Sequence, residues 1–165
     1  MVTIRPETNE DVETVVALHI RTWQKAYRGM LPDEVLDNLD PVAWAQRRRE
    51  HHANPASTAL VAEIDGVLCG FVLFGPDRDE PEHGEIYAIY VDPDYWGTGV
   101  GHELMTRALA ALPYREVRLW VLEQNERALR FYAREGLHPD GTRSAYTPRG
   151  SDFAAPEIRL ALVRG

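Results

Sequence analysis

Cysteine is almost missing from this chain, since its 165 residues contain one, Cys69. A single thiol cannot form a disulfide within the chain, which excludes a disulfide-stapled secreted scaffold. Cys69 lies inside the apolar run GVLCGFVLF, which predicts a buried strand thiol and argues against a nucleophilic role. Met1 leads directly into VTIRP without a basic-then-apolar leader, so we expect a cytoplasmic protein.

Long hydrophobic runs are also missing, and the apolar stretches are far too short to cross a bilayer. We therefore expect no membrane partner. Positive charge is in deficit, because 18 Lys and Arg residues stand against 26 Asp and Glu residues, a formal net charge of −8. This balance argues against nucleic acid as a partner. An acidic surface favours cationic ligands, although many proteins are acidic for solubility alone.

Internal repeats, low-complexity tracts and Pro-rich or Gly/Ser-rich linkers are absent as well. With 165 residues, 44% of them hydrophobic and 27% charged, the chain has the size and composition of one globular domain. We therefore predict a single domain over residues 1–165.

The first third of the chain has helical periodicity after one short strand, 3–6. Residues 8–27 place apolar side chains at helical spacing, with Thr8 or Asn9 as the N-cap candidate. Pro32 is expected at the first position of a short second helix. A third helical pattern begins at Pro41 and ends before residue 55.

From residue 58 the period changes to that of strands. Two β-branched runs are joined by the Asp65–Gly66 pair, which predicts a hairpin. Residues 85–91 are apolar on both faces, so this strand should be central in its sheet. The expected order then continues with a helix after residue 99, a strand over 116–122, a helix ending at Gly136 and a last strand over 157–163.

Three glycines in five positions, Gly97, Gly99 and Gly101, lie between the central strand and the helix that follows it. Each should weaken a regular element by about 0.5–1 kcal/mol relative to alanine. Free backbone N–H groups and the positive end of a helix dipole point outward at such a position, and a bare loop lets a phosphate approach them. An ordinary tight connection also fits the string. A P-loop does not, because His102 stands where it requires lysine.

Two segments resemble the GNAT superfamily of N-acetyltransferases. IYVDPDYWGTGVGHELM is similar to its acetyl-CoA-binding segment, written Arg/Gln-x-x-Gly-x-Gly/Ala, and matches it at Gly99 and Gly101 but departs from it at Trp96. NERALRFYAREGL is similar to the family's Asn-x-x-Ala-x-x-Phe-Tyr-x-x-x-Gly-Phe. The order of elements also matches, so the resemblance covers nearly the whole chain.

The resemblance implies an α/β (α+β) GNAT-like acyl-CoA N-acyltransferase fold. Its central sheet is mixed, mostly antiparallel, flanked by helices and splayed between the fourth and fifth strands. The resemblance also implies acetyl-CoA as co-substrate, no metal, and a homodimer as the assembly state of the family.

The cofactor-binding residues implied by the resemblance lie in three groups. Backbone groups of the central strand would pair with the pantetheine arm, amides of the glycine loop would hold the pyrophosphate, and an asparagine side chain would bind along the arm or serve as a plain N-cap. These residues are Ile89, Tyr90 and Val91, then Gly97, Thr98, Gly99, Val100, Gly101 and His102, and finally Asn125. Hydrogen bonds to a charged group contribute about 1.5–3 kcal/mol each, enough to outweigh screened charges far from the loop.

Acyl transfer to an amine requires the neutral amine, and with a pKa of about 10.4 only about one molecule in 2,500 is neutral near pH 7. The resemblance implies Glu85 as the general base that removes the proton. Strict strand alternation places Glu85, Tyr87, Ile89 and Val91 on one face. A solvated strand-end carboxylate is the equal alternative, and Glu82, His83 and Tyr87 are the other candidate bases.

The general acid implied by the resemblance is Tyr132, whose phenol would give its proton to the leaving sulfur. The alternative is a core aromatic beside Phe131. His51 and His52 are interpreted as a solvated helix end, because no third metal ligand is near them in the sequence.

For the acceptor site, Trp23 and Tyr27 lie four residues apart on one expected helix face, although most aromatics at such spacing are core. Tyr87 is a third candidate, and YTPRGSDF is the expected opposite wall. The acidic segment DRDEPEHG suits cationic acceptors.

The predicted function is transfer of an acetyl group from acetyl-CoA to a primary amine of a small molecule or peptide by direct attack. A protein N-terminal or lysine acetyltransferase and a non-catalytic acetyl-CoA-binding regulatory module are the alternatives. An unrelated phosphate-ligand enzyme is disfavoured by the motif from Asn125 to Tyr132.

Overall fold

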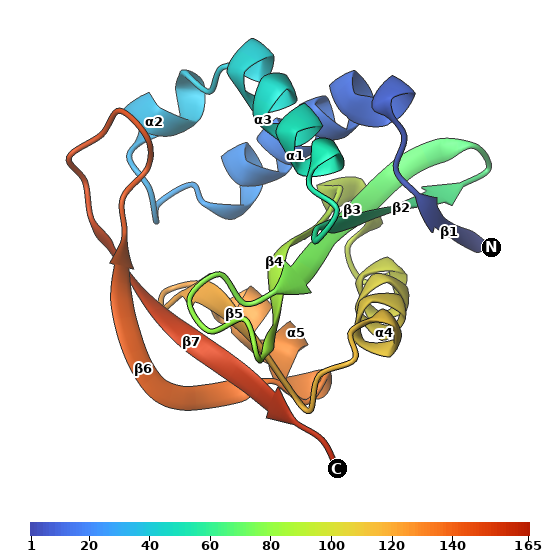
Figure 1. Ribbon diagram of the computed structural model, residues 1–165. Helices are drawn as coiled ribbons and strands as arrows, with labels where there is room; N and C mark the ends of the chain where they lie inside the picture. Colours follow the sequence, from blue (N-terminus) through green and yellow to red (C-terminus); the bar gives the residue numbers. More distant parts are fainter.

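Seven strands form one sheet in the computed structural model, which describes residues 1–165 (Figure 1). Their order is β1-β2-β3-β4-β5-β7-β6, and only the β4–β5 pair is parallel. This confirms the predicted mixed, mostly antiparallel sheet with a central fourth strand. The strands are β1 (Val2–Pro6), β2 (Thr58–Ile64), β3 (Val67–Pro76), β4 (Gly84–Val91), β5 (Glu116–Leu122), β6 (His138–Tyr146) and β7 (Ala155–Val163).

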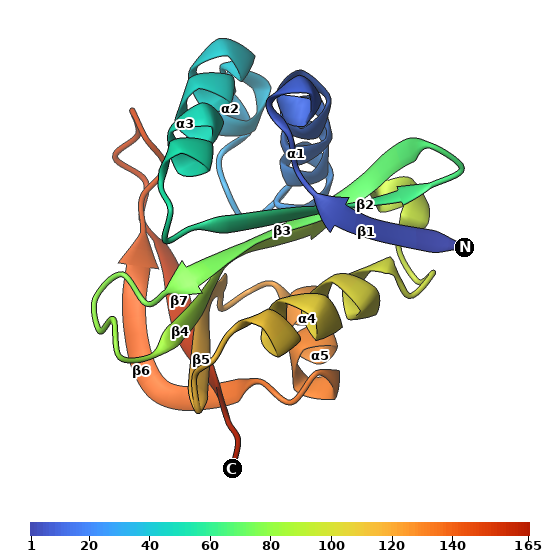
Figure 2. The same cartoon turned by 45° about the vertical axis from the view of Figure 1, so that its right-hand side comes forward.

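Helices cover both faces of this sheet. Figure 2 shows three of them, α1 to α3, on one side of β2 and β3, and the other two, α4 and α5, on the opposite side. None of the helices combines the length and the apolar composition that crossing a bilayer requires. Their bounds are α1 (Val12–Ala26), α2 (Asp33–Asp37), α3 (Pro41–Ala53), α4 (Val100–Ala111) and α5 (Glu126–Arg134), with 3-10 turns η1 (Asn9–Asp11) and η2 (Pro93–Tyr95).

The helix starts follow the capping residues of the sequence with small shifts. Thr8 forms a capping box with Asp11, but it caps η1, and α1 follows from Val12. The prediction that Pro32 occupies the first position of the second helix is wrong, because Pro32 is the N-cap of α2 with extended backbone. At α3 the side chain of Asp40 accepts hydrogen bonds from the first-turn amides.

The predicted hairpin is confirmed, with β2 and β3 joined by Asp65 and Gly66 at φ values of 51° and 79°. Such positive φ values at both central residues give the turn the twist of its flanking strands. Cys69, on β3, is a fully buried free cysteine, as expected, and burial raises the pKa of its thiol.

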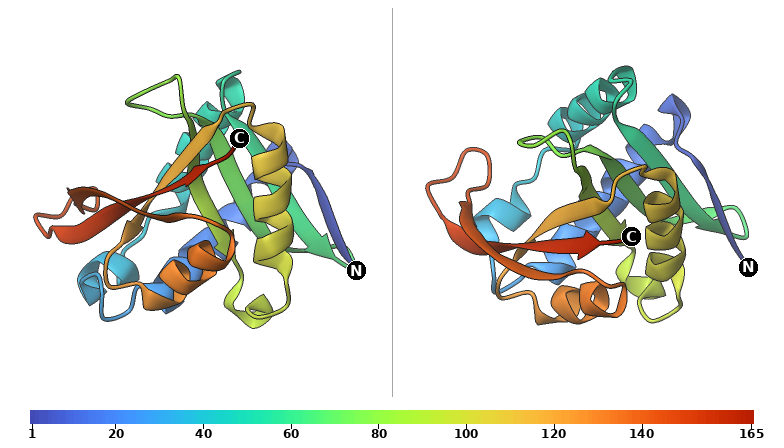
Figure 3. Two further views of the ribbon diagram at one scale, coloured as in Figure 1. Left: turned by 90° about the horizontal axis from the view of Figure 1, so that it is seen from below. Right: turned by 60° about the horizontal axis from the view of Figure 1, so that its bottom comes forward.

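One strand, β6, is not predicted by the hydrophobic pattern. Its sequence HPDGTRSAY contains proline, aspartate and glycine, and the register against β7 shifts between Pro139 and Arg143. Most of its side chains are exposed, because β6 is an edge strand and pairs with β7 alone. In both views of Figure 3 the loop joining β6 and β7 lies at the end of the molecule opposite the N-terminus.

Strand β4 contains a β-bulge that overturns one prediction. Leu73 pairs with Ala88 but Phe74 pairs with Ile86, so Tyr87 is an extra residue without a partner in β3. As a result Ile86 and Ile89 lie in the same core cluster under α4. The strict alternation that placed Glu85 on the face of Ile89 and Val91 is therefore wrong, and Glu85 shares the face of Ala88.

The sheet opens between β4 and β5, as predicted. These strands pair only at Gly84 with Val117 and at Glu85 with Arg118, whereas β5 and β7 pair along seven residues. The larger core, a cluster of 17 buried residues, lies between the sheet and α4. The rest of β4 therefore has a hydrogen-bonded neighbour only on its β3 side, and the gap on its β5 side forms the site described next.

Candidate active site

A cavity of about 1510 Å³ lies where β4 and β5 separate. Residues 86–91 of β4 and 119–122 of β5 line its middle. Its first end, here called the glycine-loop end, is formed by Trp96, Gly97, residues 99–102 and α5 with its N-cap. Thr98, a predicted cofactor-binding residue, does not line the cavity. The opposite end, here called the aromatic end, is formed by α1, α3 and the β6–β7 loop. The cavity thus joins two differently built surfaces through the gap in the sheet.

At the glycine-loop end the backbone presents a row of free donors. Gly97 and Gly99 have φ values of 77° and 90°, in the left-handed region that favours glycine, and α4 begins at Val100. None of the backbone amides from Gly97 to His102 donates a hydrogen bond within the protein. The positive end of the α4 dipole lies behind them, and free amides at such a helix start are an arrangement that suits anions.

Gly101 has a second role beyond the one that its place in the motif suggests. A Cβ atom there would lie 3.1 Å from two ring atoms of Phe131. The missing side chain therefore allows α4 and α5 to pack closely, in addition to leaving the loop bare.

Trp96, the residue that departs from the family motif, has two partners. Its indole N–H donates a hydrogen bond of 2.8 Å to the carbonyl of Val91. The guanidinium of Arg127 lies 3.5 Å from the indole ring centroid, a cation–π contact. Arg127 lines the cavity and forms no ion pair, and burial lowers its pKa. A cation thus lies beside the loop although position 96 is not basic.

Asn125 and Tyr132 also line the cavity. The Asn125 side chain accepts a hydrogen bond of 3.2 Å from the amide of Ala128, which confirms the predicted N-cap. Burial raises the pKa of the Tyr132 phenol well above its usual value, with Tyr90 raising it further and Arg127 opposing the shift. The phenol is therefore protonated throughout the physiological pH range.

Glu85 is buried and held by one arginine. Its carboxylate accepts hydrogen bonds from Arg78 at the backbone N (3.0 Å), Nε (3.2 Å) and Nη2 (2.7 Å). Arg78 lines the cavity but Glu85 does not. The predicted base therefore lies one side chain away from the cavity, with both oxygens occupied.

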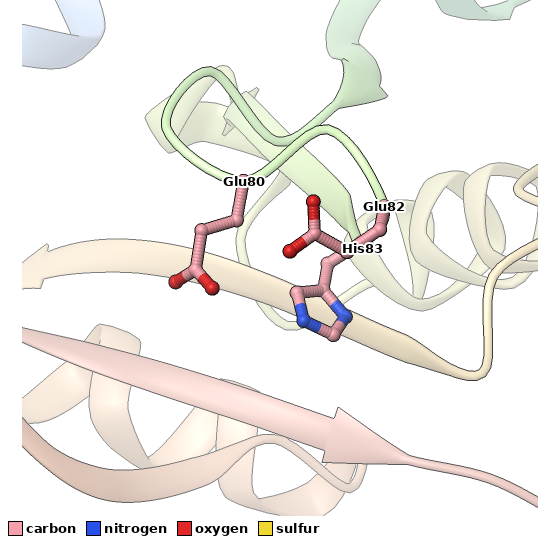
Figure 4. Close-up of side chains that lie close together, drawn as sticks. All are labelled: Glu80, Glu82 and His83. Atoms are coloured by element: carbon pink, nitrogen blue, oxygen red, sulfur yellow. The ribbon is translucent and has the colours of Figure 1, made fainter.

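Glu82 and His83 lie on the loop between β3 and β4 and do not line the cavity. Figure 4 shows them beside Glu80, with one ligand atom of each within 4.8 Å of the others. Glu80 is already paired with Arg118 at 2.7 Å, so this exposed cluster carries no metal assignment. Tyr87 does line the cavity, but its hydroxyl donates to the Pro76 carbonyl, and burial raises its pKa to about 12.

The aromatic end contains both predicted side chains, Trp23 and Tyr27, whose ring centroids are 5.2 Å apart. The expected opposite wall is also in place, since Tyr146 and residues 148–152 line the cavity. The Tyr27 and Tyr90 hydroxyls share a hydrogen bond of 2.9 Å.

Sequence reasoning missed Trp44, whose ring is 5.0 Å from that of Trp23. The pattern of α3 carried no signal that this face meets α1. His19 also lines this end, and its buried Nε2 has no hydrogen-bond partner. The interpretation of His51 and His52 as a solvated helix end is wrong. The His52 side chain is only 15% exposed and pairs with the buried Glu7 at 2.6 Å, and His51 lines the cavity.

Comparisons with known proteins agree on one family. The model of the "Acetyltransferase (GNAT) family" matches residues 18–137. The Mycobacterium tuberculosis protein named "Probable N-acetyltransferase Rv2775" is 30% identical over 163 residues, covering 98% of this chain and 93% of that protein.

Two solved structures show the same fold. PaiA N-acetyltransferase from Thermoplasma acidophilum, in complex with coenzyme A, has a TM-score of 0.77 at 21% identity, with 99% of each chain covered. The apo form of YjaB from Escherichia coli has a TM-score of 0.70 at 27% identity, covering all of this chain and 99% of that one.

Proposed function

This chain belongs to the GNAT family of N-acetyltransferases, and from that premise we propose that it transfers an acetyl group from acetyl-CoA to a primary amine of a small molecule or peptide by direct attack. The observation that carries the proposal is the row of unpaired amides from Gly97 to His102, open to a cavity in the sheet gap. The coenzyme A complex of the Thermoplasma neighbour supports it.

In this proposal the glycine-loop end binds the cofactor. The amides of residues 97–102 donate to the pyrophosphate, and charge-assisted hydrogen bonds of this kind contribute about 1.5–3 kcal/mol each. Arg127 supplies a positive charge near the pyrophosphate, although the protein as a whole has a net charge of −8. Backbone groups of Ile89 and Tyr90 bind the pantetheine arm on the open side of β4, as does Val91, whose carbonyl is shared with Trp96. Asn125 lies along the same arm.

The chemical step joins the two ends of the cavity. The neutral amine nitrogen attacks the thioester carbonyl carbon, and the C–S bond breaks when the tetrahedral intermediate collapses. The thiolate takes a proton from the Tyr132 hydroxyl, and the nitrogen loses a proton to a base. Burial keeps the Tyr132 phenol protonated, which is the form that donates.

Glu85 is proposed as the base, and this role requires its partner Arg78 to move. Both of its oxygens are engaged by Arg78, so Arg78 has to turn away before the carboxylate can reach a water or the amine. The Arg78 side chain is 65% exposed, which leaves it room to do so. The competing role is structural, with Glu85 holding Arg78 over the ring of Tyr87 at 5.1 Å.

The test is release of the coenzyme A thiol from acetyl-CoA, measured with amino acids, simple amines, polyamines and peptides, and with no amine as the hydrolysis control. Amine-dependent thiol release, with an acetylated product of the expected mass, supports the proposal. Peptide and lysine acceptors are included because the alternative of a protein acetyltransferase predicts that they alone react. Acetyl-CoA binding without release in any mixture would instead favour a non-catalytic module.

A further inference from the structure

The aromatic end contains charged side chains that the fold leaves without an ion-pair partner. Two buried or half-buried arginines nearby are paired, Arg48 with Glu7 at 2.7 Å and Arg159 with Asp140 at 2.6 Å. Among the charged residues that line this end and take part in no ion pair are Glu157 of β7, Arg47 of α3 and Arg149 of the β6–β7 loop.

Glu157 faces the cavity because of its register in the sheet. It pairs with Leu122 of β5 and with Ser144 of β6, so these side chains share one face. Tyr146, two residues after Ser144, lies on that face, and its ring centroid is 6.1 Å from that of Trp23. Glu157 is half-buried, and burial raises the pKa of its carboxyl while the charge of Arg78 opposes the shift. An unpaired carboxylate in this position is costly unless a cation binds beside it.

The two arginines lie on the walls around the same tyrosine. Burial raises the pKa of Tyr146 to about 12, and among nearby charges Glu157 raises it while Arg149 and Arg47 lower it. Tyr146 and all three charged residues line the same end of the cavity. Glu34, Asp40 and Asp152 also line this end; all three are exposed, as is Arg149, and Asp40 caps α3.

The acidic segment from Asp77 to Glu82, expected to suit cationic acceptors, does not act as a wall. Of its residues only Arg78 lines the cavity. Its acids are turned toward β5, where Asp77 and Glu80 pair with Arg118. A purely cationic acceptor would therefore meet Arg47 and Arg149 beside Glu157, the one unpaired carboxylate of this end that is not exposed.

From this juxtaposition we infer that the acceptor is a zwitterion with an apolar side chain, an amino acid or a close analogue. Its ammonium group lies against Glu157, its acid group against Arg47 and Arg149, and its apolar part against Trp23 and Trp44. This inference rests on the proposed function and narrows its acceptor class. A single planar acid group suits arginine, which donates through two parallel N–H groups. A peptide lacks this acid group beside its terminal amine and fits less well.

The experiment compares leucine, methionine and phenylalanine with their carboxamides and their decarboxylated amines as acceptors in the thiol-release assay. We expect kcat/KM to be roughly 10- to 100-fold higher for the amino acids, the effect of one or two charge-assisted hydrogen bonds. Amine ionisation works in the other direction, because the carboxamides have the less basic amines. Ionisation alone therefore cannot produce a preference over the carboxamides. The decarboxylated amines are more basic than the amino acids, so the comparison with the carboxamides decides.

Variants of Arg47, Arg149 and Glu157 test whether these residues cause the preference for amino acids over their carboxamides. Arg47→Met and Arg149→Met should reduce the amino acid to carboxamide ratio of kcat/KM toward one. Arg49→Met is the matched control, because Arg49 is on the same helix but pairs with Glu13 outside this cavity. Glu157→Gln should raise KM for every amine without changing acetyl-CoA affinity. Glu123→Gln is the control and should leave KM unchanged, because Glu123 pairs with Arg143 outside the cavity.

A second readout separates this inference from the proposed function. The protein saturated with coenzyme A is titrated with phenylalanine and with 2-phenylethylamine in a calorimeter, and tighter binding of phenylalanine is expected. Equal turnover and equal binding of the two would overturn the zwitterion site and leave acetyl transfer standing. Preferential binding without thiol release from any amine would support the site and reject acetyl transfer.

Discussion

The two ends of the cavity recognise their ligands by different means. The glycine-loop end offers backbone amides from one continuous segment, residues 97–102, and little side-chain specificity. The aromatic end offers side chains from α1, α3, β7 and the β6–β7 loop, which are far apart in the chain. A backbone site depends on local geometry and suits a ligand shared by a whole family. A side-chain site can change residue by residue, which is where differences in acceptor arise.

The largest effect should come from the junction of the two ends. Tyr132→Phe deletes the phenol proton and keeps the ring, so turnover should fall roughly 10²- to 10⁴-fold, the range expected for losing a general acid. Acetyl-CoA affinity, measured by calorimetry, should change little. Tyr114→Phe, outside the cavity, is the control. Wild-type turnover of the Tyr132 variant would contradict the general-acid role and leave Tyr132 as a packing residue.

The second effect concerns the base near the aromatic end. If Glu85 is the base, Glu85→Gln should lower the rate about 10²-fold near neutrality, and raising the pH should partly restore it because the amine then deprotonates in bulk water. Arg78→Met should keep most of the activity, because it only frees the carboxylate. Turnover against pH with one good acceptor is the measurement. Equal losses in both variants at every pH would show that the Arg78–Glu85 pair is structural.

The third effect is confined to the glycine-loop end. Gly99→Val places a β-branched residue at a φ of 90°, at a strain of about 1–2 kcal/mol, and moves the neighbouring amides. Acetyl-CoA affinity should fall roughly 10- to 100-fold, the loss of about one charge-assisted hydrogen bond. Gly141→Val is a matched control, because Gly141 has a φ of 91° and equally open surroundings outside the cavity. Similar acetyl-CoA affinities in the two folded variants would contradict the phosphate assignment.

The smallest effect is a pH dependence that only the glycine-loop end should have. His102 contacts Glu135 at 2.9 Å, and this hydrogen bond raises the pKa of the imidazole. The positive charge beside the free amides is therefore present at low pH and lost as the pH rises through the raised pKa. Acetyl-CoA affinity should fall about two- to threefold over that range, as expected for an exposed charge. His102→Gln should remove the part of the pH dependence that does not come from the ligand itself.

Most elements of the fold could be predicted from the sequence, because hydrophobic period and turn residues are local signals. The Asp65–Gly66 hairpin and the Pro41 helix start are examples. Strand β6 could not, because an exposed edge strand needs no apolar face. Nor could the bulge at Tyr87, since it exists only in the pairing of β4 with β3. That bulge reversed the face of Glu85.

The candidate site divides in the same way. Local motifs pointed to the free amides of the glycine loop and to the Asn125 cap. The neighbours of Trp96, Glu85 and Glu157 could not be predicted from the sequence. Arg127 contacts Trp96 and Arg78 binds Glu85 only because the chain folds back on itself. The neighbours of Glu157 belong to two other strands.

By itself the sequence determined the order of most elements, the hairpin, the central strand and the bare loop before α4, since each depends on neighbours within a few residues. Only the tertiary structure decided which charges are neutralised and which face the cavity. Arg48 and Arg47 are adjacent in the sequence, yet Arg48 is buried against Glu7 and Arg47 remains unpaired at the aromatic end. Electrostatic pairing depends on distance in space and on desolvation, and both are set by the packing of α3 on the sheet.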